Sequence, residues 1–164
     1  GDHRDLHYPL RRQRQMCIRD RKYFYGVSAK QLRRYYKKAS MSRMQTNIAL
    51  VQQLETRLDN MVYRMGFAGT LRAARQMVVH RHLMVNGKSV NKPGYQVNPG
   101  DVVQLRDKSK KIERYKDWFN FFEQQLNYIS RDPAKMSASL VQLPEREEIP
   151  ILVEDHLVVE YMAR

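Results

Sequence analysis

Apolar positions first become regular after residue 28, where they follow the spacing of an amphipathic helix. Ser28 with Gln31 three residues later matches a capping box, which predicts that the helix begins directly after Ser28. The inward stripe follows at i, i+3, i+4 and i+7, as Leu32, Tyr35, Tyr36 and Ala39. The other face carries five cations and no carboxylate: Lys30, Arg33, Arg34, Lys37 and Lys38. Because like charges at this spacing repel one another, the pattern favours phosphate contact over a merely solvated face.

A second apolar stripe predicts one helix from about Asn47 to Met65, and Gly66 stands where a C′ glycine is expected. Thr70 is a candidate N-cap for a short helix that ends near Val79. The inward residues of these helices are Val51, Leu54, Leu58, Met61, Met65, Ala74, Met77 and Val78. We expect their outer faces to present Arg57, Asn60, Arg64, Arg72, Arg75 and Gln76.

Short strand patterns replace the helical ones beyond residue 82. The run 83–85 leads into Asn86-Gly87, a sequence typical of a type I′ hairpin turn, with a return strand from Val90. A Pro-Gly-Asp turn signal then precedes a strand over 102–105. Three short strands after two helices predict a compact α+β unit.

An aromatic stripe follows a basic linker at 108–111. Helical spacing continues from about residue 113 to residue 129, and it indicates core packing more than a base-stacking platform. The stripe consists of Tyr115, Trp118, Phe119, Phe122, Leu126 and Ile129. Residues 138–143 are a candidate strand, whereas periodicity leaves residues 155–162 open between helix and strand.

The composition indicates a polyanionic partner, most commonly nucleic acid. The 164 residues carry 30 Lys and Arg against 17 Asp and Glu, a formal net charge of +13. Cys17 is the single cysteine, which excludes an intramolecular disulfide framework and a Cys-cluster zinc site and suits a reducing compartment. The longest apolar run, residues 48–51, is far shorter than a membrane span, and residues 1–20 lack a signal-peptide core.

Charge is unevenly distributed along the chain. Residues 1–53 carry 13 basic and 3 acidic side chains, whereas residues 107–164 carry 9 and 11. The acidic tail should avoid phosphates, so we expect it to fold back on the helix at 28–40. The residues expected to make that contact are Leu157, Val158, Tyr161 and Met162. Outward acids that are candidates for a protein interface, with a solvated acidic surface as the alternative, are Glu145, Glu147 and Glu148.

Catalytic motifs are absent from the sequence, which favours a binding protein over an enzyme. There is no Gly-rich phosphate loop, no H-E-x-x-H pair and no G-x-S-x-G elbow. His80 and His82 have no Cys, Asp or Glu beside them in the sequence to complete a metal site, so we expect no metal and no cofactor. With Arg81 they form a basic ridge, and packed surface histidines are the alternative. We expect this ridge and Lys88 to extend the face of the two preceding helices.

Four segments resemble the alpha-L RNA-binding motif. They are RLDNMVYRMGFA at 57–68, AARQMVVH at 73–80, VNGKSV at 85–90 and PGDVV at 99–103. The flanking sequence narrows the resemblance to the family of small-subunit ribosomal protein four. The flanks that match are YGV at 25–27, KQLRRYY at 30–36, LETRLDN at 54–60, LPER at 143–146 and LVVEY at 157–161.

The resemblance implies a helical domain formed by residues 21–46 and 144–164, with an α+β domain of residues 47–143 inserted between them. The RNA-binding motif occupies about 55–106 of that insertion, and residues 155–162 are expected to be helical. Members of the family bind the small-subunit rRNA early in assembly, at a multi-helix junction of its 5′ domain. They also contact small-subunit ribosomal protein five at an interface associated with decoding accuracy. We therefore expect a ribosomal rRNA-binding protein that is neither an enzyme nor a homo-oligomer.

Two features depart from the family pattern. The family's usual basic N-terminal region, which in many members carries a Cys-based zinc or iron–sulfur module and lines the mRNA entry channel, has no match in residues 1–20. Residues 12–21 instead resemble translated sequencing-adapter sequence, so we assign this segment no function. The HRH sequence at 80–82, where many relatives have glycine, is similar to plastid members. The sequence is therefore compatible with a ribosome in the bacterial cytoplasm or in an organelle.

Other functions are compatible with an alpha-L motif alone. A free-standing protein that acts on ribosomal subunits or tRNA is one alternative, and the RNA-binding appendage of an RNA-modifying enzyme is another. The residues after Arg106 show no acid, base or nucleophile constellation for a catalytic domain. A DNA-binding factor that uses residues 70–79 as a recognition helix is disfavoured, because a helix-turn-helix does not need the strands that follow.

Overall fold

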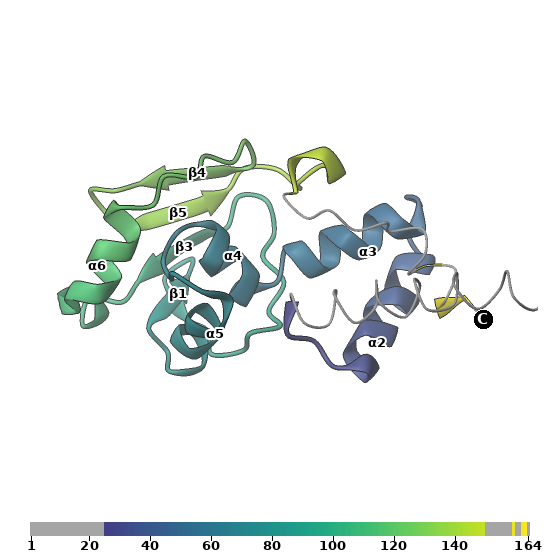
Figure 1. The fold of residues 1–164 in the computed structure, drawn as a ribbon, viewed down its shortest axis with the longest axis horizontal. Helices are drawn as coiled ribbons and strands as arrows, with labels where there is room; N and C mark the ends of the chain where they lie inside the picture. The colour runs from purple at the N-terminus through teal and green to yellow at the C-terminus, as the bar shows by residue number, and fades with distance from the viewer. Residues whose placement is uncertain (1–24, 150–158, 160–161, 164) are drawn as a thin grey trace, which may run out of the picture. The chain divides into compact units, whose positions relative to one another are not determined.

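The computed structural model describes residues 25–149, 159, 162 and 163, and these divide into two compact units. One unit contains the described residues up to Leu54 together with those from Ile149 onward. The other is Glu55–Glu148, which carries the sheet (Figure 1). Both observed divisions lie a few residues further along the chain than the boundaries that the sequence predicts.

The first unit packs helix α2 (Ala29–Ser40) against helix α3 (Thr46–Glu55). The capping box is confirmed: the Gln31 amide donates to Ser28 Oγ at 3.2 Å, and the Ser28 amide donates to Gln31 Oε1 at 3.3 Å. The helices share a buried cluster that includes Leu32, Ala39, Ala49, Leu50, Val51 and Leu54. The charged face of α2 therefore points away from α3.

The C-terminal tail is described at only a few positions. Met162 packs against the cluster of α2 and α3, as expected, and the Ala163 amide donates to the Val159 carbonyl at 3.0 Å, which is a helical bond. The other three residues expected to make this contact, Leu157, Val158 and Tyr161, lie outside the described residues.

The prediction of one helix from Asn47 to Met65 is wrong, because the chain leaves the helical path at Thr56 and Arg57. Helix α3 ends at Glu55, and helix α4 (Leu58–Arg64) begins after the two residues. Arg57 forms an antiparallel bridge with Gln96, and the Val97 amide donates to the Thr56 carbonyl at 2.9 Å. Pairing with a loop 40 residues later in the chain therefore replaces the helical hydrogen bonds here.

Five antiparallel strands form one sheet in the order β2-β1-β3-β5-β4. The strands are β1 (Leu83–Val85), β2 (Lys88–Ser89), β3 (Val102–Leu105), β4 (Ile129–Asp132) and β5 (Ser137–Leu140). The α+β class is confirmed, and the candidate strand at 138–143 corresponds to β5, whereas β4 was not predicted. The hairpin turn is also confirmed, since φ is 51° at Asn86 and 81° at Gly87. Its return strand begins at Lys88, however, and not at Val90.

The predicted aromatic helix at 113–129 is half as long in the structure. Helix α6 (Glu113–Asn120) ends early, and Ile129 begins strand β4, which pairs with β5. The Arg131 guanidinium donates to the carbonyl oxygens of Met65, Phe119 and Phe122, and it lies 4.1 Å from the centre of the Phe119 ring. A side chain from β4 thus satisfies carbonyl groups where α6 ends.

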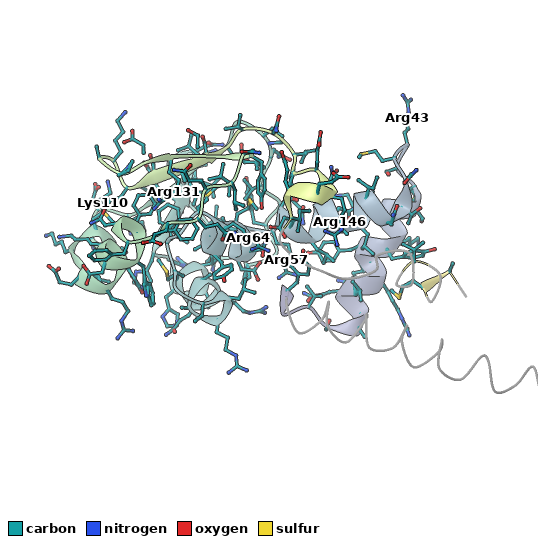
Figure 2. The ribbon with its side chains drawn as sticks, turned by 45° about the horizontal axis from the view of Figure 1, so that its top comes forward. Arg43, Arg57, Arg64, Lys110, Arg131 and Arg146 are labelled. Carbon is teal, nitrogen blue, oxygen red and sulfur yellow. The ribbon has the colours of Figure 1, made fainter. Side chains whose placement is uncertain are left out.

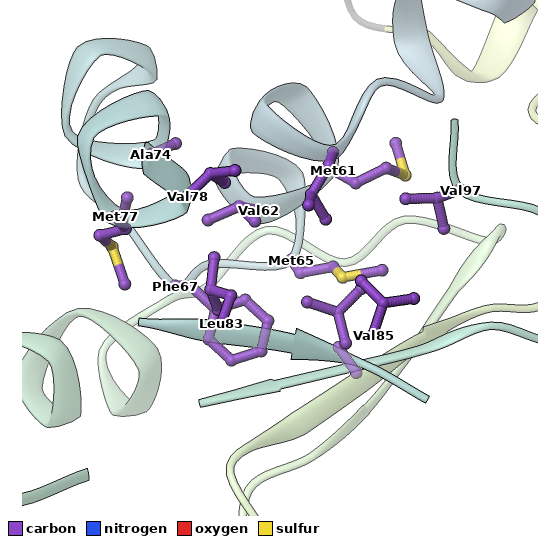
Figure 3. Close-up of a cluster of buried hydrophobic side chains, with 14 of the residues drawn as sticks. Met61, Val62, Met65, Phe67, Ala74, Met77, Val78, Leu83, Val85 and Val97 are labelled. Atoms are coloured by element: carbon purple, nitrogen blue, oxygen red, sulfur yellow. The ribbon is translucent and has the colours of Figure 1, made fainter. Parts of the chain in front are cut away.

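One face of the sheet is covered by α4, α5 (Leu71–Val79) and α6, and the core lies between them. Figure 3 shows Met61 and Val62 of α4, and Met65 directly after it, with Ala74, Met77 and Val78 of α5 around Leu83 and Val85 of β1. Phe119 of α6 is buried and stacks on Phe67 with ring centres 4.9 Å apart. This confirms that the aromatic stripe serves core packing.

Candidate nucleic-acid interface

The clearest candidate surface is the outward face of α5. The Thr70 side chain caps the helix by accepting from the Ala73 amide at 3.1 Å, which fixes where the first turn begins. Burial of Ala74, Met77 and Val78 against the core then turns the opposite face to solvent. Exposed polar side chains on that face are Arg72, Arg75, Gln76 and His80. No acidic residue occurs between Thr70 and His82, and the carboxylate of Asp59 on α4 lies near enough to Arg75 for that charge to oppose the rise that burial causes in its pKa.

The ridge that follows α5 is only partly open. Arg81 is exposed and has a left-handed backbone with φ of 62°. His82 is half-buried: its ring packs edge-on against Tyr115 at 5.1 Å, and its Nδ1 lies 2.7 Å from Ser109 Oγ. Burial, with His80 and Arg106 nearby, holds the pKa of His82 below its ordinary value. The structure therefore favours a packed, neutral His82, while His80 and Arg81 remain accessible.

Lys88 lies on the exposed hairpin of β1 and β2. The turn that carries it is fixed by Asn86, whose side chain donates to Asp101 Oδ1 and accepts from the Val102 amide, both at 2.9 Å. This cation therefore follows a hydrogen-bonded turn, and its place on the same face as α5 stays a prediction.

The expectation that Arg57, Asn60 and Arg64 lie on an open face is wrong. Their exposed fractions are 1%, 1% and 4%, and both arginines are labelled in Figure 2. Arg57 forms a two-bond ion pair with Asp59 at 3.2 Å. Arg64 Nε lies 2.7 Å from Glu55 Oε1. These side chains are occupied inside the protein and offer no charge to a polyanion.

The buried polar cluster around Glu55 joins three parts of the chain. Besides Arg64, it receives the Tyr128 hydroxyl, which donates to Glu55 Oε1 at 3.1 Å, and Asn60 Nδ2 donates to the Glu55 carbonyl at 2.7 Å. Burial, reinforced by the Glu55 carboxylate, raises the pKa of Tyr128. Burial also raises the pKa of Asp59, and the Arg57 charge opposes that shift. The cluster acts in folding, because each charge has its partner within hydrogen-bond distance.

In the other unit, α2 carries a second cationic surface. Lys30, Arg33, Arg34, Lys37 and Lys38 are all exposed, and the helix has no acidic residue in its first turn. Leu32 and Ala39 are buried and Tyr35 and Tyr36 pack against the same cluster, so the cationic positions face outward. The predicted phosphate-contacting face of this helix is thus available.

The three candidate acids of the tail differ in their surroundings. Glu145 and Glu147 are exposed, whereas Glu148 is half-buried and its carboxylate accepts from the Glu145 amide at 3.1 Å. All three belong to the unit that contains the sheet. Of these three acids, Glu147 in the short 3-10 turn (Arg146–Glu148) and Glu145 directly before it are therefore the ones exposed to a partner.

The described residues contain no metal-binding cluster and no membrane-spanning helix. No group of three His, Cys, Asp or Glu side chains close enough to hold a metal occurs among them. None of the helices in this part of the chain is long and apolar enough to cross a membrane. What the described surface presents is fixed positive charge, which is suited to phosphates.

Comparison with known proteins decides which family this surface belongs to. The model of the S4 domain matches residues 56–103, the segment that contains α4, α5, β1 and β2 and ends within β3. A small ribosomal subunit protein uS4B from Clostridium acetobutylicum is 44% identical over 141 residues, which cover 86% of this chain and 73% of the relative. The chain belongs to the uS4 family of small ribosomal subunit proteins.

Other uS4 proteins support the same assignment. The protein of Parabacteroides distasonis is 46% identical over 144 residues, covering 87% of this chain and 72% of the relative. The uS4 protein of Natranaerobius thermophilus is 42% identical over 167 residues, and the match covers 96% of this chain and 80% of the relative. Residues 21–164 alone make up less than 96% of the chain. The match therefore also includes part of residues 1–20, to which the sequence analysis assigned no function.

One basic segment was passed over in the sequence analysis. Residues 108–111 were interpreted as a linker, but they form the 3-10 helix η1 (Ser109–Lys111), which is attached to the ridge through Ser109. The sequence does show a high density of cations between Arg106 and Lys116. Only the fold shows that this segment lies beside the ridge.

Proposed function

We propose that this uS4 chain binds a multi-helix junction in the 5′ domain of the small-subunit rRNA, early in assembly, and contributes to decoding accuracy. Membership of the family makes it a structural, rRNA-binding protein of the small subunit. Because these relatives are bacterial ribosomal proteins, its location is the ribosome in the cytoplasm. The junction, the early step and the accuracy role are what the family resemblance adds.

The observation that carries the proposal is the exposed cationic face of α5 within the S4-domain match. Arg72 and Arg75 stand one helical turn apart on a helix whose other side is anchored in the core. Such cations are spaced along a rigid element, so they fit phosphates of a folded RNA backbone. With Gln76, His80, Arg81 and Lys88 they form the proposed contact surface of this unit. The exposed cations of α2 form a second one.

Recognition of this kind reads RNA shape more than base sequence. A-form RNA displays phosphates and 2′-hydroxyls, and side chains cannot enter its deep, narrow major groove. A small exposed helix and a two-residue hairpin therefore suit contact along the backbone at a junction, where several helices bring phosphates together.

The test is competition between rRNA fragments. A transcript of the 5′ domain should bind more tightly than a transcript of equal length from another domain of the same rRNA. A DNA copy of the 5′ domain should compete poorly if 2′-hydroxyls and A-form shape matter. Equal affinity for all three would show charge attraction without junction recognition and would contradict the proposal.

We also propose that Glu145 and Glu147 face small-subunit ribosomal protein five. Their exposure and negative charge support a basic protein partner, since carboxylates are repelled by rRNA within a Debye length of about 8 Å. Reversing both charges should weaken that protein contact and leave rRNA affinity unchanged or slightly raised. A strong loss of rRNA binding would mean that these acids do not face a protein partner and would contradict this proposal. In this proposal the chain acts as a single copy, without catalysis or a cofactor.

A further inference from the structure

We propose that the segment from Arg106 to Arg114 is a second RNA-contacting surface of the sheet-containing unit, which binds phosphates through Lys108, Lys111 and Arg114. The inference rests on the proposed rRNA-binding function. It adds a contact that lies outside the S4-domain match at 56–103 and outside the α5 face.

The first argument is unbalanced charge. Residues 106–116 contain six cations and only two acids, Asp107 and Glu113. Lys110 Nζ lies 3.4 Å from Asp107 Oδ1, so one cation is balanced within the segment. Lys108, Lys111 and Arg114 are exposed, and no ion pair joins them to a carboxylate in the part of the chain that the structure describes. Their mutual repulsion is relieved when a polyanion binds.

The second argument is rigid attachment to the ridge after α5. The Arg106 amide donates to the His82 carbonyl at 2.9 Å, and Arg106 Nη1 donates to the Arg81 carbonyl at 3.2 Å. Ser109, 4% exposed, places its Oγ 2.7 Å from His82 Nδ1, and Tyr115 packs on the His82 ring. These contacts fasten η1 and the start of α6 to the ridge. The backbone that carries the cations beyond Arg106 is therefore held in place before any RNA arrives, which lowers the entropy lost on binding.

The third argument is that the surface suits RNA better than protein. Protein interfaces are built around apolar or aromatic anchors, with charged residues depleted at their centre. Between Arg106 and Lys116 the only large apolar side chain with substantial exposure is Ile112, at 37%. The segment also continues from the proposed contact surface at His80 and Arg81. A row of exposed cations joined to another such row fits a phosphate backbone.

The binding test uses the full chain and a transcript of the rRNA 5′ domain, with affinity measured by filter binding over a range of salt. The triple variant Lys108→Ala, Lys111→Ala, Arg114→Ala should lower the salt slope by about one unit for each lost phosphate contact. It should also weaken binding at 100 mM salt by about tenfold or more. The charge-conserving triple Lys108→Arg, Lys111→Arg, Arg114→Lys should keep the wild-type slope, and circular dichroism should show that both are folded.

A second measurement does not depend on folding of the triple variant. With Cys17→Ser as background, an iron chelate attached at Lys111→Cys should cleave the transcript at a discrete set of nucleotides, different from those cleaved from Arg72→Cys. The same chelate at Lys135→Cys, in the turn after β4, is the control on an exposed lysine of the same unit. Discrete cleavage from position 111 supports the inference.

A wild-type salt slope in the triple variant, with cleavage from position 111 no stronger than from position 135, would overturn it. In that case we would infer that these cations bind an acidic protein partner instead of RNA. The α5 variant Arg72→Ala, Arg75→Ala separates the two proposals. If it loses affinity while the triple variant does not, only the second surface is wrong. If wild-type binding is itself insensitive to salt, the proposed function fails as well.

Discussion

At the scale of single residues, arginines of one protein unit serve opposite purposes. Arg57 and Arg64 are buried beside carboxylates and hold the fold, whereas Arg72 and Arg75 are exposed on α5. Arg57 lies in the bridge before α4, and Arg64 lies on α4, a helix that is buried on nearly every side, whereas α5 buries only one of its faces. Position relative to the core therefore decides whether a cation is a structural group or a candidate ligand for phosphate.

Replacing Arg64 by alanine should destabilise the protein by about 3–5 kcal/mol, because Glu55 would keep a buried charge without its partner at 2.7 Å. Urea unfolding at neutral pH measures the change. Arg72→Ala is the matched control, since the same truncation at an exposed site should change stability by less than about 0.5 kcal/mol. Similar losses in the two variants would show that the ion pair contributes nothing particular.

Leu58 and Arg75 separate packing from binding. Leu58 is fully buried, so Leu58→Ala should cost about 2–5 kcal/mol of stability. Arg75→Ala should weaken rRNA binding with little change in melting temperature, because Arg75 is exposed. Thermal melts beside filter binding measure both. If Arg75→Ala melted as early as Leu58→Ala, the assignment of the α5 faces would be mistaken.

His82 should make stability depend on pH. Its pKa is lower in the folded protein than the ordinary value of 6.5, because burial and neighbouring cations disfavour the protonated ring. The folded state therefore binds this proton less readily than the unfolded state, and the stabilisation is complete above about pH 6.5. It is lost as the pH falls below that value.

The measurement is the melting temperature between pH 7.5 and pH 5.5, compared with that of His82→Gln. The wild-type protein should lose more stability over this interval than the variant, which cannot titrate at this position. The other histidines are common to both proteins and cancel in the comparison. Parallel curves for the two proteins would mean that His82 does not contribute.

At the scale of elements, local signals specified the ends of helices and the tight turn. Ser28 and Thr70 cap α2 and α5 as predicted, and Asn86-Gly87 makes the predicted turn with positive φ at both residues. Each of these features depends on side chains within three residues, so sequence alone contains the information.

Elements that depend on pairing with a distant segment of the chain could not be predicted from the local sequence. The interruption between α3 and α4 depends on the bridge from Arg57 to Gln96. The apolar spacing in the sequence continues across residues 56 and 57, so it gives no sign of this interruption. Strand β4 was interpreted as helix because Ile129 continues the spacing of α6, although it pairs with Leu140. The burial of Arg64 likewise depends on where Glu55 comes to lie. The periodicity of apolar residues contains no information about such long-range partners.

Gly66 should be required by the turn between α4 and α5. Its φ is +86°, and a Cβ there would clash with side-chain atoms of Phe122. Gly87 has a similar φ of +81° but open space around it, so it is a matched control. Gly87→Ala should cost about 1 kcal/mol of backbone strain, and Gly66→Ala should cost clearly more.

Chemical denaturation of the two variants and of Gly66→Ala combined with Phe122→Ala completes the comparison. Removing the Phe122 ring should recover part of the loss caused by Gly66→Ala, because the steric contact is then gone. Equal losses for Gly66→Ala and Gly87→Ala would indicate that only backbone conformation matters at these turns.

At the scale of the whole molecule, the net charge of +13 is arranged on separate surfaces. The exposed cations of α2 belong to one unit, and those of α5, the ridge and η1 belong to the other. The acidic residues of the described chain are concentrated in its second half or buried with arginines. A protein that binds a folded RNA at several places needs such an arrangement, since phosphate contacts give both affinity and orientation.

The account rests on neutralisation of rRNA phosphates by these exposed cations, and the salt dependence of binding measures it directly. The affinity of the wild-type chain for the rRNA 5′ domain should be measured between 50 and 200 mM monovalent salt. If about six to ten phosphates are contacted, the affinity should fall by roughly 10³ to 10⁵ over this range. Binding whose strength does not change with salt would contradict the account.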